Sequence, residues 1–453
     1  MQTASRKEAR NVRLASLGAA LEYYDFVAYI YVAALISAAF FPAEASPAVR
    51  LAQTLAIYSI GFVVRPVAGI VMAHIADRIG RKRIFMLTIV MMSGSTLAIG
   101  LLPTYESIGW LAPALLLTMR VIQGCAVGGE LPGAAVLVAE HSRTERVARS
   151  AAVLQSMSYG GFLLGAGAAF GASLVVEYLT PDMPSLAWRL PFLLGGVLGL
   201  VAIYLRRVLE ETPLFAELQE RGQAGRQTPL ATVLRRDRRP VAFAFLMVFA
   251  MSMLNTVFFQ YWPTYLQVDL GHSATLAIAA SLITIVGAMV SMPLWGLVAD
   301  RHGWRSSLGI GAGLLAISSV PIFVVAPLLP ADSGWILLIA LPAAFATGSI
   351  VSATPGLVAS LFRTEVRQSA YAMPYNIGVV VFGGPLPLIL VWAIATGGPV
   401  APLYVVLLGA LAAGVAAFFV SRMTFFLGNW ATTPSEPGRV AAGGPRSTST
   451  GGA

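Results

Sequence analysis

Five charged side chains lie within segments that are otherwise apolar, and their types suit the binding of a proton or an organic ion. They are Glu22, Asp25, Arg65, Arg120 and Glu130. A charge at the centre of a bilayer costs about 2.5–3.5 kcal/mol on insertion scales, so a charge kept there indicates a function or an internal ion pair. Each of the five therefore has two interpretations, a role in binding or a contact that only joins helices.

Glu22 and Asp25 are three residues apart in "LEYYDF" and are expected to share one face of a helix. Two carboxylates that lie close together in a medium of low dielectric cannot both ionise cheaply, so one should hold a proton. We predict that Asp25 is the main proton carrier, followed by Glu22, and that Arg120 and Glu130 take part in proton coupling. The alternative for Glu130 is an ion pair with a basic residue of a nearby loop.

Arg65 and Arg120 are predicted to bind the substrate, because a guanidinium binds a carboxylate through two parallel hydrogen bonds. The alternative is that each is only the counter-ion of an internal acid. A proton on that acid would then free the arginine for a substrate. Polar and aromatic groups in other apolar segments complete the predicted substrate site, although such aromatic residues also serve as packing or interface anchors: Tyr23, Tyr261, Tyr265, Tyr375 and Asn376.

The composition indicates a membrane protein with many spans. The chain has 453 residues, of which 57% are hydrophobic and 11% charged, whereas soluble domains average about 25% charged residues. Most of the 30 Lys and Arg residues fall in alternate loops, which predicts that both termini are cytoplasmic. The net positive charge is therefore a topology signal, and no nucleic-acid partner is expected.

No sequence pattern indicates an enzyme, a metal site or a cofactor. The single cysteine, Cys125, excludes an internal disulfide and a cysteine metal cluster. No two histidines within one helix have metal-ligand spacing, and no phosphate-binding loop motif is present.

We predict an all-α membrane protein with twelve transmembrane helices in two pseudo-symmetric six-helix bundles. The predicted parts are an N-terminal arm (1–13), a first bundle (14–207), a central cytoplasmic loop (208–238), a second bundle (239–426) and a disordered cytoplasmic tail (427–453). The apolar spans lie at about 14–41, 50–76, 84–103, 108–139, 148–177, 188–207, 239–268, 273–299, 306–329, 334–361, 368–396 and 401–426.

An internal repeat supports the division into halves. "AHIADRIGRKR" follows the second span and "GLVADRHGWRS" follows the eighth. Acids and bases in these loops could hold the two halves together at one end, and the glycines suit a tight turn. The predicted gating residues are Asp77, Arg78, Gly80, Arg81, Asp300, Arg301 and Gly303.

The first of these loops resembles the signature of the major facilitator superfamily, G-x-x-x-D-R-x-G-R-K/R, with Ala73 in place of the first glycine. "RVIQGCAVGGELPGA" resembles the R-x-x-Q-G motif of its fourth helix. "LEYYDF", "VVRPVAG" and "FRTEVRQSAYAMPYNIGVVVFGG" resemble motifs of its metabolite:proton symporter family, except that Arg363 stands where that family has proline.

This resemblance implies proton-coupled import of a small organic acid or zwitterion by alternating access around a site between the bundles. The substrates of the family include 2-oxoglutarate, citrate, shikimate, dicarboxylates, proline and betaine. It also implies a multi-pass protein of the bacterial inner membrane that uses the proton as coupling ion and needs no cofactor. We expect it to function as a monomer.

Two other classes stay open. A proton-antiport exporter of drugs or metabolites would carry G-x-x-x-G-P-x-x-G-G in the fifth helix, where "YGGFLLGAGAAFG" has no proline. A sensor derived from a transporter would carry a signalling domain, and we expect none in the short tail.

Overall fold

The computed structural model describes residues 2–207, 217, 219–220, 237–330 and 333–427. Within these residues all regular structure is helical. Almost all of the predicted central loop (208–238) and of the predicted disordered tail (427–453) lies outside the described residues.

The N-terminal half consists of six long helices joined by short segments. α1 begins at Gln2, so most of the predicted N-terminal arm belongs to this helix. The elements are α1 (Gln2–Tyr31), α2 (Ala33–Phe40), α3 (Pro47–Ile79), α4 (Arg81–Leu101), α5 (Tyr105–Ile108), α6 (Leu111–His141), η1 (Thr144–Arg146), α7 (Val147–Tyr178) and α8 (Leu186–Arg206).

The C-terminal half contains π-helical segments, in which the hydrogen bonds join residues i and i+5. They are η2 (Thr256–Tyr261), η3 (Tyr265–Asp269) and η5 (Val379–Gly383). The other elements are α11 (Arg238–Asn255), α12 (Trp262–Thr264), α13 (Ala274–Val325), η4 (Ala326–Leu328), α14 (Ile336–Ile339), α15 (Leu341–Ser360), α16 (Arg367–Gly378), α17 (Leu386–Gly397), α18 (Ala401–Phe419) and η6 (Val420–Arg422).

Ten helices among the described residues are long and apolar enough to cross a membrane, and the bent pair α1–α2 makes an eleventh span if it is counted as one. The predicted eighth and ninth spans lie together in α13, a helix of 52 residues that Gly303 interrupts with φ 81° and ψ 162°. The chain is therefore a multi-pass membrane protein. The count of twelve spans stays a prediction.

The repeated loops contain the same backbone feature. Gly80, between α3 and α4, has φ 115°, and Gly303 has φ 81°. Residues with a side chain rarely adopt such positive φ values, whereas glycine does so at little cost. The predicted tight turn therefore occurs at equivalent positions in the two halves.

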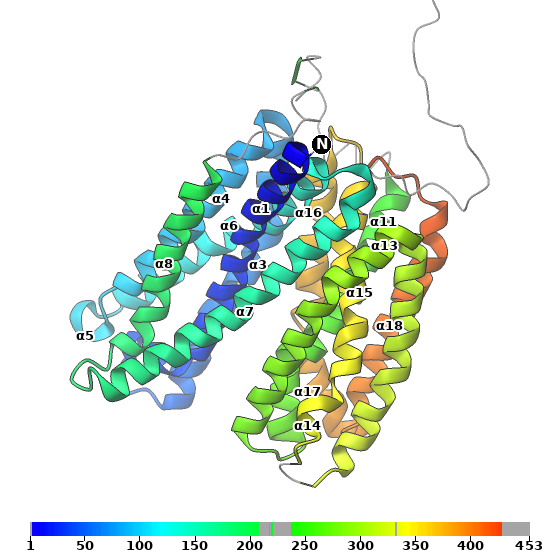
Figure 1. Ribbon diagram of the computed structural model, residues 1–453. Coiled ribbons are helices and arrows are strands. Elements are labelled where there is room, and N and C mark those ends of the chain that lie inside the picture. Colours follow the sequence, from blue (N-terminus) through cyan, green and yellow to red (C-terminus); the bar gives the residue numbers. More distant parts are fainter. Residues whose placement is uncertain (1, 208–216, 218, 221–236, 331–332, 428–453) are drawn as a thin grey trace, which may run out of the picture.

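The two halves form two helical bundles (Figure 1). They meet near the end where the N-terminus lies, which we call the N-side, and diverge toward the opposite end, near α5 and α14. Contacts between the halves join α3 and α6 to α16, and α7 to α13 and α15. The fold thus leaves space between the bundles beyond the contacts at the N-side.

Glycines set the close packing of α3 on α6. A Cβ atom at Gly128 would lie 2.7 Å from the carbonyl oxygen of Arg65 and 2.7 Å from the nitrogen of Gly69. A Cβ atom at Gly124 would lie 2.4 Å from the carbonyl oxygen of Gly61. Small residues are typical where membrane helices pack backbone to backbone. This contact fixes the positions of the two arginines, which lie on α3 and α6.

Candidate functional site

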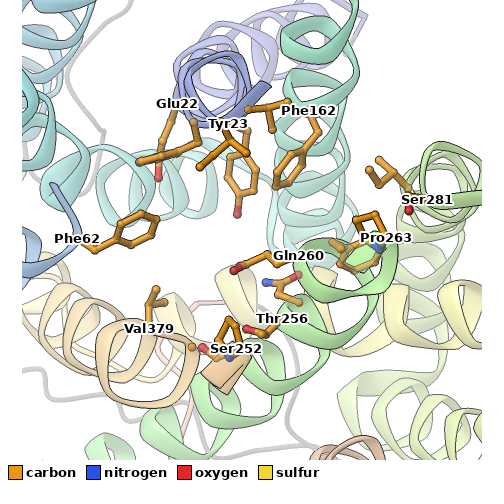
Figure 2. Close-up of a pocket in the computed structure, with 18 of the residues that line it drawn as sticks. Glu22, Tyr23, Phe62, Phe162, Ser252, Thr256, Gln260, Pro263, Ser281 and Val379 are labelled. Carbon is orange, nitrogen blue, oxygen red and sulfur yellow. The ribbon is translucent and has the colours of Figure 1, made fainter. Parts of the chain in front are cut away.

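A cavity of about 400 Å³ lies between the bundles and is lined by residues of both halves. Figure 2 shows Glu22, Tyr23 and Phe162 on one side of it and Ser252, Thr256 and Gln260 on the opposite side. Among the described lining residues, Glu22 and Arg65 are the charged ones. Aromatic rings make up much of the remaining lining: Tyr23, Phe26, Tyr31, Tyr58, Phe62, Phe162, Phe259 and Tyr375.

Helical spacing on α3 positions Arg65. Val63, Val67 and Val71 are 67%, 70% and 51% exposed and form the outward stripe of the helix. Arg65 lies on the other side, is buried and lines the cavity. Its guanidinium carbon lies 4.2 Å from the ring centre of Phe26 and 4.1 Å from that of Phe62. Cation–π contacts of this kind hold the charge in a fixed orientation.

Glu22 and Arg65 form a loose pair. Arg65 Nη1 lies 4.0 Å from Glu22 Oε1, which is too far for a hydrogen bond. Within the described part of the chain, Glu22 Oε2 and Arg65 Nε and Nη2 are buried and have no hydrogen-bond partner. Unmet hydrogen-bonding capacity of buried charged groups is costly, so this pair is suited to accept a ligand with groups of both signs.

Asp25 has a different environment, although it shares α1 with Glu22. Arg120 Nη1 donates a hydrogen bond to Asp25 Oδ2 at 2.8 Å. Gln123 Nε2 and Thr96 Oγ1 donate to Asp25 Oδ1 at 2.9 and 3.0 Å. Asp25 and Arg120 are buried inside the N-terminal bundle, and neither lines the cavity.

The two acids thus have separate basic partners, Arg65 for Glu22 and Arg120 for Asp25, and only the second pair is hydrogen-bonded. Three residues turn a helix by an angle about 60° short of a full rotation. That offset is enough to direct Glu22 toward α3 and Asp25 toward α4 and α6. The spacing in the sequence predicted one shared helix face for the two acids. It did not predict that they contact different helices.

Glu130 lies deep in the N-terminal bundle and is fully buried. Thr88 Oγ1 donates a hydrogen bond to Glu130 Oε2 at 2.6 Å. Glu130 does not line the cavity. A proton that binds Glu130 would therefore move through the protein interior and not through the cavity.

The cavity contains some of the predicted substrate residues but not others. Tyr23, Arg65 and Tyr375 line it, while Arg120 does not. Tyr261 and Tyr265 also lie away from it, because Tyr261 donates to Asp269 Oδ2 at 3.0 Å and Tyr265 donates to the Pro399 carbonyl at 2.7 Å. These tyrosines belong to η2 and η3, whose π-helical turns change the face that later residues present.

Asn376, another predicted substrate residue, joins the two bundles. Its Nδ2 donates to the carbonyl oxygens of Gly128 and Ala372, in each case at 2.9 Å. Gly128 belongs to α6 and Asn376 to α16. In this conformation Asn376 therefore contributes to the contact between the halves and not to the cavity lining.

The two repeated aspartates cap helices of the opposite half. Asp77 accepts hydrogen bonds from the backbone nitrogens of Ser369, at 2.9 Å, and Gln368, at 3.4 Å, in the first turn of α16. Asp300 accepts from those of Ala148, at 3.0 Å, and Arg149, at 3.1 Å, in the first turn of α7. A carboxylate is favourable at a helix N-terminus, so these two contacts hold the bundles together at the N-side.

A buried charge cluster lies beside Asp77. Arg81 forms ion pairs with Asp77, at 3.6 Å, and with Glu140, and it donates to the Thr364 carbonyl at 2.5 Å. Glu140 also pairs with Arg367 of α16. Arg78 and Arg301, two of the predicted gating residues, are exposed instead.

Glu140 and Arg367 were not predicted from the sequence as functional residues. In the sequence, each is a charged residue at the boundary of an apolar span. Charged residues of solvated loops occupy the same kind of position, so the pattern did not single these two out. Among the described residues, no group of three or more His, Cys, Asp or Glu side chains is placed to hold a metal ion.

Solved structures confirm the type of fold. The proton:xylose symporter XylE, solved with 6-bromo-6-deoxy-D-glucose, superposes with a TM-score of 0.72 at 17% sequence identity. The superposition covers 92% of this chain and 95% of that one. At such low identity it establishes the fold alone.

Sequence comparisons establish the family. The Major Facilitator Superfamily profile matches residues 15–382. The proline/betaine transporter of Escherichia coli K12 is 32% identical over 398 residues, which are 86% of this chain and 78% of the relative. The glycine betaine/proline/ectoine/pipecolic acid transporter OusA of Dickeya dadantii is 33% identical over 399 residues, which are 84% of this chain and 77% of the relative. The predicted superfamily is thus confirmed: the chain belongs to the Major Facilitator Superfamily, and it is a membrane transporter and not an enzyme.

Proposed function

We propose that this protein imports a small organic zwitterion together with protons across the inner membrane of a bacterium. The observation that carries the proposal is the loose pair of Glu22 and Arg65 in an aromatic cavity. Oppositely charged groups with unused hydrogen-bonding atoms match a ligand that has one charge of each sign. A dicarboxylate such as succinate could place one carboxylate on Arg65. Its second carboxylate would then find no further basic side chain among the described lining residues and would be repelled by Glu22.

Each end of the zwitterion has a defined partner in this proposal. The substrate carboxylate binds Arg65 through Nε and Nη2, the two nitrogens that lack a partner among the described residues. The ammonium group lies near Glu22 and against the ring of Tyr23. Aromatic faces attract quaternary ammonium groups, which cannot donate hydrogen bonds. The names of the relatives, proline/betaine transporters, agree with this chemistry.

Proton coupling is assigned to Asp25 and Arg120, with Glu22 and Glu130 as further proton-binding groups. Asp25 accepts three hydrogen bonds as a carboxylate, and one comes from Arg120. A proton on Asp25 would remove the charge that holds Arg120. Since Asp25 lies less than one turn from Glu22 on α1, the change would reach the cavity through that helix. No cofactor other than the proton is needed, and a monomer is sufficient.

In the proposed transport cycle the N-side faces the cytoplasm, as the distribution of Lys and Arg residues predicts. Asp77 of α3 caps α16 and Asp300 of α13 caps α7, so the bundles are joined there, and they diverge toward the opposite face. Release of substrate into the cytoplasm requires these helix caps to break while the bundles close at the other end.

Uptake into proteoliposomes tests the proposal. Labelled glycine betaine, proline, 2-oxoglutarate and succinate would be offered outside vesicles with an imposed inward proton gradient. We expect accumulation of a zwitterion but not of the dicarboxylates, and a protonophore should abolish it. Accumulation of a dicarboxylate would contradict the assigned substrate class. Faster efflux of preloaded substrate upon proton entry would favour the exporter alternative.

A further inference from the structure

Two hydroxyl groups lie on the side of the cavity that belongs to the C-terminal half. Ser252, near the end of α11, and Thr256, the first residue of η2, are 4% and 0% exposed, and both line the cavity. They lie one helical turn apart, opposite Glu22 and Tyr23 (Figure 2). The zwitterion-binding groups assigned above are all on the other side, so this pair has no role in the proposed function as stated.

Neither hydroxyl is satisfied within the described part of the chain. Hydroxyls in helices usually bond the carbonyl four residues earlier. Ser281, which lines the same cavity, does so with Ala277 at 2.7 Å. Ser252 Oγ and Thr256 Oγ1 have no such partner, nor any other among the described residues. A buried hydroxyl without a partner is costly, which indicates that a ligand group or a water supplies the missing bonds.

The facing segment has a glycine next to the two hydroxyls. Gly383, the last residue of η5, has no side chain, and a Cβ atom there would lie 3.7 Å from Ser252 Cβ and 3.8 Å from Thr256 Oγ1. The glycine therefore adds no side chain to this part of the cavity lining, which we call the recess, whereas a larger residue would contact both hydroxyls.

The chemistry of the recess is neutral. The described lining residues of the C-terminal half include no charged side chain. Asn255, their neighbour, accepts a hydrogen bond from Tyr159 of the other half through Oδ1. Two hydroxyls can each donate one hydrogen bond and accept others, a combination that fits an uncharged group which both donates and accepts. A substrate hydroxyl is the simplest group of that kind.

We propose that Ser252 and Thr256 form a second polar subsite that binds a hydroxyl group of the substrate, so that the protein prefers hydroxylated zwitterions to their unsubstituted analogues. The inference rests on the proposed function, because the carboxylate and ammonium of the same molecule bind Arg65 and Glu22. The cavity of about 400 Å³ lies within the range that accommodates ligands larger than a minimal amino acid.

Matched substrate pairs test the subsite. Binding of proline against trans-4-hydroxyproline, and of glycine betaine against carnitine, would be measured on the purified full chain in nanodiscs. For at least one pair, wild type should bind the hydroxylated member about tenfold more tightly. The double variant S252A/T256V should lose that preference while its affinity for the unsubstituted member stays within about twofold of wild type.

Two further variants separate recognition from damage to the fold. S281A removes a hydroxyl that lines the same cavity but is already bonded, so it should keep the wild-type preference. S252A/T256S, which restores one hydroxyl, should recover part of it. The subsite is refuted if wild type shows no preference in either pair, or if S252A/T256V keeps it. If wild type binds none of the four compounds, the proposed function fails together with the subsite.

Discussion

Replacing Arg65 by alanine should weaken zwitterion binding strongly. Two charge-assisted hydrogen bonds from Nε and Nη2 to a carboxylate contribute about 1.5–3 kcal/mol each. The lower end of that range for both bonds gives about 3 kcal/mol in total, which corresponds to an affinity loss of about 100-fold. Arg65→Lys keeps the charge but loses the paired donors and the planar contact with Phe26 and Phe62, so a loss of about tenfold is expected.

Equilibrium binding of labelled glycine betaine to the purified protein measures this effect without the transport cycle. Arg50→Ala serves as the matched control, since Arg50 also lies on α3 but does not line the cavity. Its affinity should stay within about twofold of wild type. An Arg65→Ala variant that binds the zwitterion within about threefold of wild type, with no change in Arg50→Ala, would refute the role assigned to the loose pair.

Further predictions concern coupling, gating and packing. Asp25→Asn removes the charge that pairs with Arg120, so it should abolish accumulation under a proton gradient but retain exchange of labelled for unlabelled substrate; accumulation at the wild-type level would contradict the assignment. Asp77→Ala and Asp300→Ala each remove a helix cap worth about 0.5–2 kcal/mol, so either should increase the population open at the N-side, measured as spin-label distances between α3 and α16; unchanged distances would argue against this gate. Gly128→Ala should lower the midpoint of thermal unfolding, because its Cβ atom would lie 2.7 Å from backbone atoms of α3 and overpacking costs about 1–3 kcal/mol. Gly171→Ala, with no atom within 4 Å of the added Cβ, is the control, and equal midpoints would contradict the packing account.

Local sequence rules predicted the parts of the structure that depend on local chemistry. The repeat of aspartate and glycine after two apolar spans predicted the turns at Gly80 and Gly303, which both have positive φ. Charges within apolar segments predicted buried groups, and Glu22 and Arg65 do line the cavity. These features follow from backbone sterics and from the cost of a charge in lipid, which act on each segment alone.

The partners of the buried groups depend on packing between distant segments, which the sequence pattern does not contain. Asp25 and Glu22 are three residues apart, yet contacts with different helices give them different environments. The π-helical segments η2 and η3 disrupt the helical period, so spacing alone misplaced Tyr261 and Tyr265. Charged residues at the boundaries of apolar spans were expected to be solvated. Glu140 is instead buried between the two halves, where it pairs with Arg81 and Arg367.

The central claim is that zwitterion and proton move together in the same direction, and a dye for internal pH tests it directly. Glycine betaine would be added outside proteoliposomes at equal pH on both sides, with the membrane potential held at zero. The account predicts acidification of the interior that requires the added substrate, and no acidification with Asp25→Asn. Betaine entry without acidification, or with alkalinisation, would contradict proton symport.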